Sequence, residues 1–210
     1  MNYSHILWDF NGTILNDVNI GVESANILLE RHGLNVLKSI DEYRSVFGFP
    51  IIDYYRRLGF DFSKTPYNEL AVEWVEIYNS LSDKAFLYEG VTQLLTLIKN
   101  SGTKQLILSA TELKMLTKQL KSLGIYGYFD EVLGTGDIYA YSKKDIAINW
   151  ANKISPNNPV LIGDTVHDFE VANAAGFDCI LIANGHEPKS SLLKTDSVVV
   201  DTIKDIIDLL

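Results

Sequence analysis

The feature that most restricts the fold of this chain is its alternation of short apolar runs with amphipathic segments. The apolar runs predict strands, and in the segments between them apolar residues recur at helical spacing. The predicted strands are 5–8, 104–108, 131–133, 159–162, 179–182 and 197–200. Strands that alternate with helices favour right-handed crossovers in a parallel sheet. We therefore expect an α/β fold with a doubly wound, Rossmann-like parallel sheet.

One long stretch departs from this alternation. From about Asn16 to Lys84 the sequence predicts helices and no strand. Within it, Thr65 is expected to cap a helix whose first residue is Pro66, because proline is tolerated at that position. This stretch therefore predicts a helical cap inserted at the carboxyl end of the first strand.

The boundaries and the broad class of the protein follow from length and composition. We expect an α/β core of residues 1–15 and 85–210 and a helical cap of residues 16–84. With 210 residues and 47% hydrophobic residues, the chain can bury a proper core. The formal net charge of -9 argues against nucleic acid as a partner, because a phosphate polymer needs a basic surface.

The cysteine content and the apolar runs bear on location. Cys179 is the one cysteine of the sequence, so no disulfide can form within the chain, and a reducing compartment is the simpler expectation. The longest uninterrupted apolar run, 179–183, is too short to cross a bilayer, and the first residues lack the basic region of a signal peptide. We expect a cytoplasmic protein with no membrane partner.

Several polar residues stand where predicted strands end. Asp9 follows the first strand, Ser109 the second, and Asp164 a later one, with Asp168 four residues further on. Lys143 precedes the helix that leads into the strand before Asp164. In a parallel sheet these groups converge at one edge, where open α/β sheets bind ligands. Carboxylates suit Mg²⁺, and a lysine and a serine beside them suit phosphate, which together indicate phosphoryl transfer.

These residues lie in four short motifs whose order along the chain is informative. The motifs are Asp-Phe-Asn-Gly-Thr at 9–13, Leu-Ser-Ala-Thr at 108–111, Ser-Lys at 142–143 and Gly-Asp-Thr-Val-His-Asp at 163–168. In this order, with a helical stretch in the first gap, they resemble the haloacid dehalogenase superfamily. Phe-Gly-Phe-Pro at 47–50 is similar to the all-helical cap of its phosphoglycolate-phosphatase-like members. The resemblance covers the whole chain.

The resemblance implies a role for each acidic residue. Asp9 would be the nucleophile and a Mg²⁺ ligand, and it would carry an aspartyl phosphate. The backbone carbonyl of Asn11 and the side chain of Asp164 would be further Mg²⁺ ligands. Asp168 would support the metal from its outer shell.

The resemblance also implies how phosphate is held. Ser109 would hydrogen-bond the transferring phosphoryl group, together with the backbone around Gly12, Thr13 and Ala110. Lys143 would neutralise the charge of Asp9 and of the phosphate, with Lys144 as the alternative.

Asn11 departs from the family's usual pattern. Phosphatases of this family usually have an aspartate at this position, which protonates the leaving oxygen and then deprotonates water. Asn has no titratable proton, and general acid–base help is worth typically ~10²- to 10⁴-fold in rate. We expect a slow phosphatase, or one biased toward good leaving groups. Asn-Gly is a pair prone to deamidation, and conversion of Asn11 to Asp would recreate the family's usual pair of aspartates. An engineered substitution at this position is a separate alternative.

Simpler roles stand beside these. Asp164 and Asp168 could merely favour the N-terminus of a following helix, and Ser109 or Thr111 could be only an N-cap. His167 is expected to be a solvated loop residue. In the predicted cap, solvated or packing roles are expected for four residues that could also face the substrate, namely Arg44, Tyr54, Arg56 and Arg57.

The sequence thus favours a Mg²⁺-dependent phosphatase of a small phosphorylated metabolite, acting as a monomer or a homodimer. The alternative is a catalytically impaired, haloacid-dehalogenase-like protein that binds a phosphorylated metabolite or regulates a partner. A third hypothesis is a protein that forms a stable aspartyl phosphate on Asp9, because hydrolysis lacks its base.

Overall fold

A six-stranded parallel sheet forms the centre of the molecule. The computed structural model describes residues 2–139 and 142–210. The strand order is β5-β4-β1-β6-β7-β8, and each neighbouring pair is parallel. The strands are β1 (His5–Trp8), β4 (Lys104–Glu112), β5 (Glu131–Thr135), β6 (Pro159–Gly163), β7 (Asp178–Ile182) and β8 (Val198–Val200). The expected doubly wound α/β fold is confirmed.

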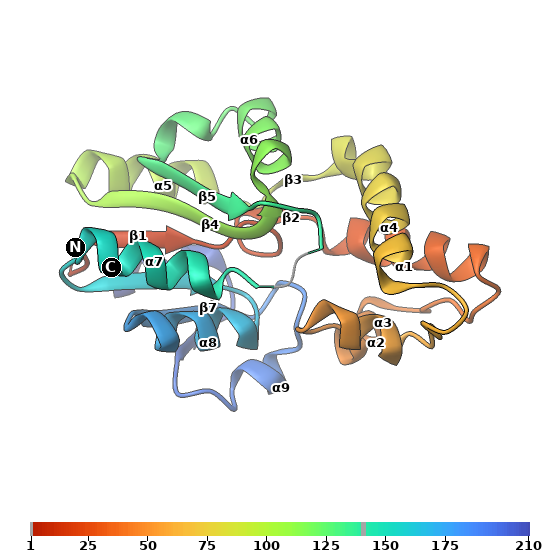
Figure 1. Ribbon diagram of the computed structural model, residues 1–210. Helices are drawn as coiled ribbons and strands as arrows, with labels where there is room; N and C mark the ends of the chain where they lie inside the picture. Colours follow the sequence, from red (N-terminus) through yellow and green to blue (C-terminus); the bar gives the residue numbers. More distant parts are fainter. Residues whose placement is uncertain (1, 140–141) are drawn as a thin grey trace.

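Helices cover both faces of this sheet (Figure 1). They are α5 (Val91–Ser101), α6 (Leu113–Ser122), α7 (Lys144–Ile154), α8 (Val166–Ala175) and α9 (Lys189–Leu192), with 3₁₀ turns η2 (Tyr126–Tyr128) and η3 (Ile203–Leu209). Helices α5 and α6 share one apolar cluster with η3, and α7 and α8 share another on the opposite face. The fold is therefore a three-layer sandwich, with the two termini at one end of it (Figure 1).

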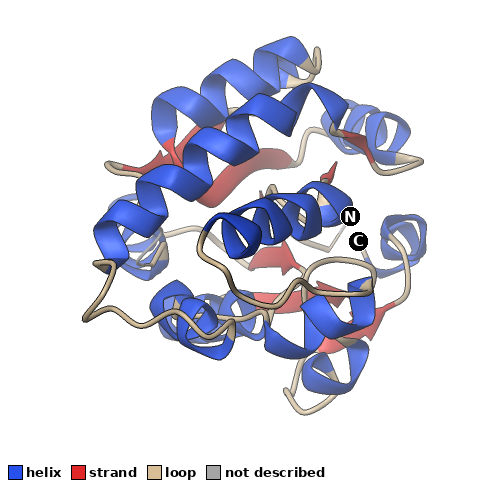
Figure 2. Cartoon of the chain, turned by 90° about the vertical axis from the view of Figure 1, so that its right-hand side faces the viewer, coloured by secondary structure: helices blue, strands red, loops and turns tan. Residues whose placement is uncertain are grey.

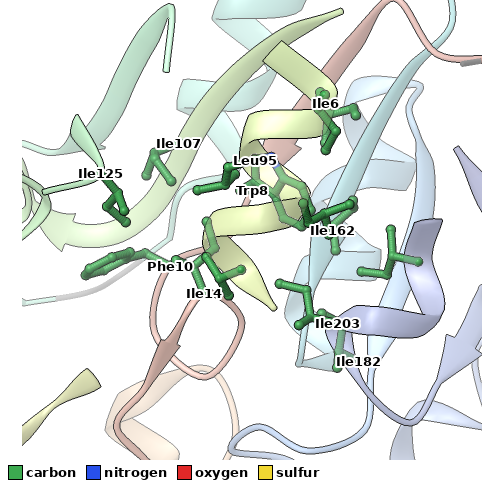
Figure 3. Close-up of a cluster of buried hydrophobic side chains, with 14 of the residues drawn as sticks. Ile6, Trp8, Phe10, Ile14, Leu95, Ile107, Ile125, Ile162, Ile182 and Ile203 are labelled. Carbon is green, nitrogen blue, oxygen red and sulfur yellow. The ribbon is translucent and has the colours of Figure 1, made fainter. Parts of the chain in front are cut away.

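Alternation along β1 explains why the central strand is buried on both sides. Ile6 and Trp8 belong to the cluster under α5 and η3, whereas Leu7 belongs to the cluster under α7 and α8. All three side chains are fully buried, and Figure 3 shows Ile6 and Trp8 in their cluster. Such a strand reads as a continuous apolar run. This burial fixes β1, and with it the position of Asp9 at its end.

The stretch between β1 and α5 contains four helices with an apolar cluster of their own. They are α1 (Val18–Arg31), α2 (Ile40–Val46), α3 (Ile51–Arg57) and α4 (Tyr67–Leu81), followed by the 3₁₀ turn η1 (Ser82–Lys84). We call residues 18–81 the helical insertion. It lies beyond the carboxyl ends of the strands, and in the view from its side its helices lie in front of the sheet (Figure 2).

The sequence predicted no strand at the junctions of this insertion, and there the structure differs. Two short strands, β2 (Leu15–Asn16) and β3 (Phe86–Leu87), pair as an antiparallel ribbon. The two crossings between sheet and insertion are therefore tied together by backbone hydrogen bonds. Two residues a strand are too few to produce a periodic signal in the sequence.

Two other local predictions were wrong. Helix α4 begins at Tyr67 with Pro66 at its N-cap, so Thr65 is not the cap. The backbone N–H of Thr65 bonds instead to the carbonyl of Asp61 at 3.1 Å. Strand β4 continues to Glu112 through an irregular register after Leu108. Within residues 2–139 and 142–210, no helix combines the length and apolar character that crossing a membrane requires.

Candidate active site

Asp9 and Lys143 form a buried ion pair where β1 ends. The backbone N–H of Asp9 still bonds to Ile162 of the neighbouring strand at 2.8 Å, which holds the residue at the sheet edge. The Lys143 ammonium contacts the Asp9 carboxylate, lies 2.6 Å from Asp168 Oδ1, and donates to the carbonyl of Leu108 at 3.0 Å. Lys143 is 2% exposed, whereas Lys144 is exposed. Of the two lysines, the structure therefore brings Lys143 to Asp9.

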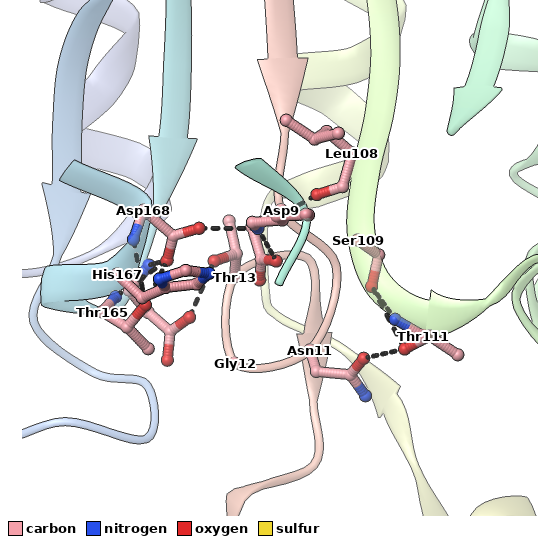
Figure 4. Close-up of polar contacts among 12 residues, drawn as sticks. Asp9, Asn11, Gly12, Thr13, Leu108, Ser109, Thr111, Thr165, His167 and Asp168 are labelled. Carbon is pink, nitrogen blue, oxygen red and sulfur yellow. Dashed lines mark hydrogen bonds and ion pairs between the residues drawn. The ribbon is translucent and has the colours of Figure 1, made fainter. Parts of the chain in front are cut away.

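Asp168 is oriented from two sides. It is the third residue of α8 and forms a capping box with Thr165, whose hydroxyl donates to Asp168 Oδ2 at 2.6 Å. The backbone N–H groups of Asp164 and Thr165 bond to the same oxygen. The other oxygen faces Lys143. The Asp168 side chain thus both caps α8 and orients Lys143 (Figure 4).

Asp164 directly follows β6, the neighbour of β1, and is also held by the backbone. Its Oδ2 accepts the N–H of His186 at 2.6 Å, and its Oδ1 accepts the hydroxyl of Thr13 at 3.2 Å. Asp164 is 1% exposed and Thr13 is fully buried. Thr13 therefore supports Asp164.

Glycines leave the space that these carboxylates occupy. A Cβ at Gly12 or at Gly185 would lie 2.3 Å or 2.1 Å from Asp164 Oδ2, and one at Gly163 would lie 2.2 Å from Asp168 Cγ. The N–H of Gly12 is already bonded to the Leu15 carbonyl and to Asp17, each at 2.9 Å. Any larger residue at these positions would displace an acidic side chain.

Oxygen ligands converge here in a way that suits a divalent cation. Carboxylate oxygens of Asp9, Asp164 and Asp168 lie within 4.8 Å of one another, and all three residues are buried. With the Lys143 ammonium, three carboxylates leave a formal charge of about -2, which a hard divalent ion would balance. The chemistry of this donor set therefore fits Mg²⁺.

Burial is the largest influence on the pKa values of all three carboxylates. Burial raises the pKa of Asp9 to about 6, although Lys143 opposes the shift. Burial also raises the pKa of Asp164 well above its usual range. Burial acts to raise the pKa of Asp168 as well, but the nearby Lys143 outweighs it and the pKa is lowered. Asp168 thus stays ionised beside Lys143.

Asn11 is fixed by hydrogen bonds on both sides of its amide. Its Nδ2 donates to Asp17 Oδ2 at 2.7 Å and to the Tyr78 hydroxyl at 2.9 Å, and its Oδ1 accepts from the Thr111 hydroxyl at 2.9 Å. The side chain thus connects the core to α4 of the helical insertion. None of these contacts gives Asn11 a titratable proton.

Ser109 lies in β4, next to Asp9 and opposite Asp168 (Figure 4). Its hydroxyl donates to Thr111 Oγ1 at 3.1 Å and accepts the Thr111 N–H at 3.1 Å. The N-cap of the following helix is Glu112, so a capping role for Ser109 or Thr111 is wrong. Ser109 and Ala110 both line the cavity described below.

The sequence did not reveal a second buried ion pair beside the cluster. His186, in the loop after β7, lies 3.2 Å from Asp17 Oδ1, and its other ring nitrogen lies 2.8 Å from the Tyr43 hydroxyl. Burial acts to lower the pKa of His186, but the neighbouring Asp17 carboxylate has the larger effect and raises the pKa to about 9. Burial likewise acts to raise the pKa of Asp17, but His186 lowers it overall. The pair is therefore charged near neutral pH.

His167 was expected in a solvated loop, and that prediction was wrong. It lies in α8, is 9% exposed, and its ring stacks on Phe49 of the helical insertion with 4.3 Å between centroids. The sequence gave no sign that Phe49 would reach this helix. Phe49 and His167 both line the cavity described below.

A cavity of about 160 Å³, open to solvent, lies between the sheet edge and the helical insertion. Asp9, Ser109 and Lys143 line it from the core, and Tyr54 and Trp74 line it from the insertion. The sequence-predicted residues Asp9, Asn11, Ser109, Lys143, Asp164 and Asp168 all border this cavity. The arrangement places a buried carboxylate, a buried ammonium and a candidate cation site at one end of this cavity.

Comparisons with known proteins agree with this geometry. Residues 6–182 match the family described as haloacid dehalogenase-like hydrolase. The chain is 26% identical to a phosphoglycolate phosphatase of Nitrosococcus oceani, over 98% of this chain and 95% of that protein. It is 23% identical to the probable phosphatase IndB of Dickeya dadantii, over 96% and 91%. A haloacid dehalogenase-like hydrolase of Streptococcus pneumoniae has a similar fold, with a TM-score of 0.78, 20% identity and coverage of 100% and 99%.

Proposed function

The chain belongs to the haloacid dehalogenase-like hydrolase family, and from this premise we propose that it is a Mg²⁺-dependent phosphatase of a small phosphorylated metabolite. The observation that carries the proposal is the buried cluster of Asp9, Asp164 and Asp168 with Lys143 at the sheet edge. Asp9, Asp164 and Asp168 all line the cavity. Asp9 is 8% exposed and the other two are 1% exposed, so Asp9 is the carboxylate that a bound phosphate would meet. The similarity to two phosphatases supports the same reaction.

In the proposed reaction, Asp9 attacks phosphorus and forms an aspartyl phosphate, while the bond from phosphorus to the leaving oxygen breaks. Lys143 holds the attacking carboxylate in its ionised form and offsets the charge that gathers on the phosphoryl oxygens. Water then attacks phosphorus, and the bond to Asp9 breaks to return the carboxylate and release phosphate.

Asp9, Asp164 and the backbone carbonyl of Asn11 would hold Mg²⁺, with Asp168 in support. Bound there, Mg²⁺ would neutralise charge on the phosphoryl group. We further propose that Ser109 and the backbone of Ala110 contact the phosphate. The roles of Gly12 and Thr13 in phosphate binding stay predictions, because their contacts in the structure go to Asp17, Leu15 and Asp164.

The helical insertion is proposed to act as a cap, with residues 16–84 as its bounds and residues 1–15 and 85–210 as the core. Its own apolar cluster and the paired strands β2 and β3 at its base support this division. Closure over the cavity would exclude water during transfer. A cytoplasmic location and a monomeric or homodimeric state stay predictions.

The experiment that tests the proposed function is release of phosphate from acetyl phosphate by purified protein, with and without Mg²⁺. We expect turnover that requires Mg²⁺ and disappears in Asp9→Asn. Lys144→Ala is the control, because that side chain is exposed. Turnover that persists in Asp9→Asn would refute the proposed nucleophile.

Asn11 supports a second candidate, a phosphate-binding or regulatory protein with little turnover. Its amide is committed to Asp17, Tyr78 and Thr111 and supplies no acid or base. This candidate predicts that phosphate and Mg²⁺ raise the melting temperature without release of product. Label retained on Asp9 after exposure to acetyl phosphate would instead indicate a stable aspartyl phosphate.

A further inference from the structure

The cavity above the acidic cluster has an aromatic wall. From the helical insertion its lining includes Phe47, Tyr54, Tyr55, Tyr67, Trp74 and Tyr78. Trp74 stacks on Tyr78 with 5.0 Å between centroids and 20° between ring planes. The hydroxyl of Tyr78 reaches Asn11 and Asp17, so this wall is continuous with the site where Asp9 would receive phosphate. Aromatic walls of this kind bind apolar, planar groups.

The same cavity lacks a free cation for a second anionic group on the substrate. Among its lining residues in the described part of the chain, Lys143 is the only lysine or arginine, and Asp9 and Asp168 hold its ammonium. His186 is neutralised by Asp17. A substrate carboxylate would therefore meet acidic side chains with no uncompensated positive charge, which costs free energy.

The arginines of the helical insertion do not change this balance. Arg44 donates to the carbonyls of Asn184 and Gly185, each at 2.8 Å. Arg57 donates to the carbonyls of Val46 and Gly48, and Arg56 pairs with Asp53. None of the three is among the residues that line the cavity.

Two buried polar atoms of the wall have no hydrogen-bond partner among the described residues. They are the hydroxyl of Tyr54, a residue 3% exposed, and the indole N–H of Trp74. Both residues line the cavity, although these two atoms themselves have no exposed surface. Leaving a buried donor unpaired costs about 1–3 kcal/mol, so a turn of either side chain toward an acceptor on a ligand would recover that cost.

From these observations we propose that the substrate is a phosphate monoester of a planar, uncharged ring that carries a hydrogen-bond acceptor, rather than a small phosphorylated carboxylate. This inference rests on the proposed function and names its substrate class. The ring packs against the wall formed by Trp74 and Tyr78, and its acceptor bonds to Tyr54 or to the indole of Trp74. Phosphorus lies at Asp9.

Asn11 agrees with this substrate class. When Asp9 bonds to phosphorus, the electron pair of the broken bond goes to the leaving oxygen. Asn11 cannot protonate that oxygen, so a phenol-type oxygen leaves as the anion and takes its proton from solvent. A phenol ionises near a pKa of ~10, far more readily than an alkyl alcohol. In the second step water adds to phosphorus, its proton goes to solvent, and Asp9 recovers its electron pair.

The test is direct binding of three phosphonates, which carry no cleavable ester bond, measured by calorimetry in the presence of Mg²⁺. We expect phenylphosphonate to bind about tenfold or more tightly than methylphosphonate, because burying a ring contributes that much. Phosphonoacetate, which carries a carboxylate, is expected to bind no better than methylphosphonate. Equal affinity for phenylphosphonate and methylphosphonate, or tighter binding of phosphonoacetate, would overturn the inference.

Conservative variants test the acceptor contact. The probe is 4-acetylphenylphosphonate, whose carbonyl is a hydrogen-bond acceptor that phenylphosphonate lacks. Tyr54→Phe and Trp74→Phe should each reduce the preference of the protein for this probe over phenylphosphonate, because each variant keeps an aromatic ring and loses a hydrogen-bond donor. The matched control is Tyr126→Phe, at an exposed position on η2. An unchanged preference in both cavity variants would remove the acceptor from the proposal.

Hydrolysis of acetyl phosphate keeps the two proposals separate. If acetyl phosphate is hydrolysed but phenylphosphonate binds no better than methylphosphonate, the substrate class is wrong and the phosphatase proposal stands. If Asp9→Asn leaves phosphate release unchanged, the phosphatase proposal fails whatever the phosphonates do.

Discussion

The amide of Asn11 donates a 2.7 Å hydrogen bond to the buried carboxylate of Asp17. A carboxylate at position 11 would therefore stand beside another carboxylate. Asp17 in turn accepts from Tyr78 at 2.7 Å and pairs with His186. Asn11 is thus part of a network that links the core to the helical insertion.

Asn11→Asp should make the protein a better catalyst for alkyl phosphates. The new carboxyl group would share a proton with Asp17, which raises its pKa and keeps it protonated, as a general acid requires. We expect turnover of alkyl phosphates to rise by about 10²-fold or more, with little change for aryl phosphates. Measuring both substrates as a function of pH checks this, because the gain should fall as pH rises through the raised pKa.

The control for this substitution is Asn11→Ala, which also loses the amide but gains no acid. It should show no gain with either substrate. Equal gains of Asn11→Asp for alkyl and aryl phosphates would contradict the argument from the leaving group.

Lys143→Met should cost both stability and activity. It leaves Asp9 and Asp168 buried without their ammonium, and breaking a buried ion pair costs about 3–5 kcal/mol. Urea unfolding near neutral pH without Mg²⁺ measures the loss. Lys144→Met, one residue away and exposed, should lie close to wild type. A similar loss in both variants would argue against a special role of the buried ammonium.

The acidic cluster could be predicted because its members follow strands. Asp9, Ser109 and Asp164 end predicted strands, and parallel topology alone brings such positions to one edge. Lys143 and Asp168 were found from the motifs around them. The contacts that orient these side chains, such as the capping box of Thr165 with Asp168, add precision that strand topology does not contain.

The residues that were missed depend on how the helical insertion packs on the core. Asp17 and His186 are 169 positions apart, and nothing local to either residue indicates the other. His167 is buried because Phe49 of the insertion stacks on it. Periodicity reveals which face of a helix is apolar, but it does not reveal which distant ring will cover a given side chain.

The Asp17–His186 pair should make stability depend on pH in a defined direction. The pKa of His186 is raised from the unfolded value of ~6.5 to about 9, so the folded state holds the proton more tightly. Its contribution, about 3 kcal/mol, is complete below the unfolded pKa and is lost as pH rises through 9. Comparing wild type with His186→Asn in unfolding experiments without Mg²⁺ should show a difference that shrinks over this range.

His167 provides a control of opposite sign. Burial lowers the pKa of its ring, so the folded state resists protonation and loses stability as pH falls below the unfolded value. His167→Asn should therefore approach or exceed wild type on the acidic side. A pH dependence of the same sign in both histidine variants would contradict the assigned shifts.

Gly185→Ala should weaken Mg²⁺ binding without unfolding the protein. A Cβ at this position would lie 2.1 Å from Asp164 Oδ2, so the Asp164 side chain must move from its present position. Displacing a ligand in this way should raise the Mg²⁺ concentration needed for thermal stabilisation by about 10- to 100-fold. Gly136→Ala is the matched control, because a Cβ there meets nothing within 4 Å. If Gly185→Ala responds to Mg²⁺ as Gly136→Ala does, Asp164 is not a ligand, since no metal held by that carboxylate could tolerate its displacement.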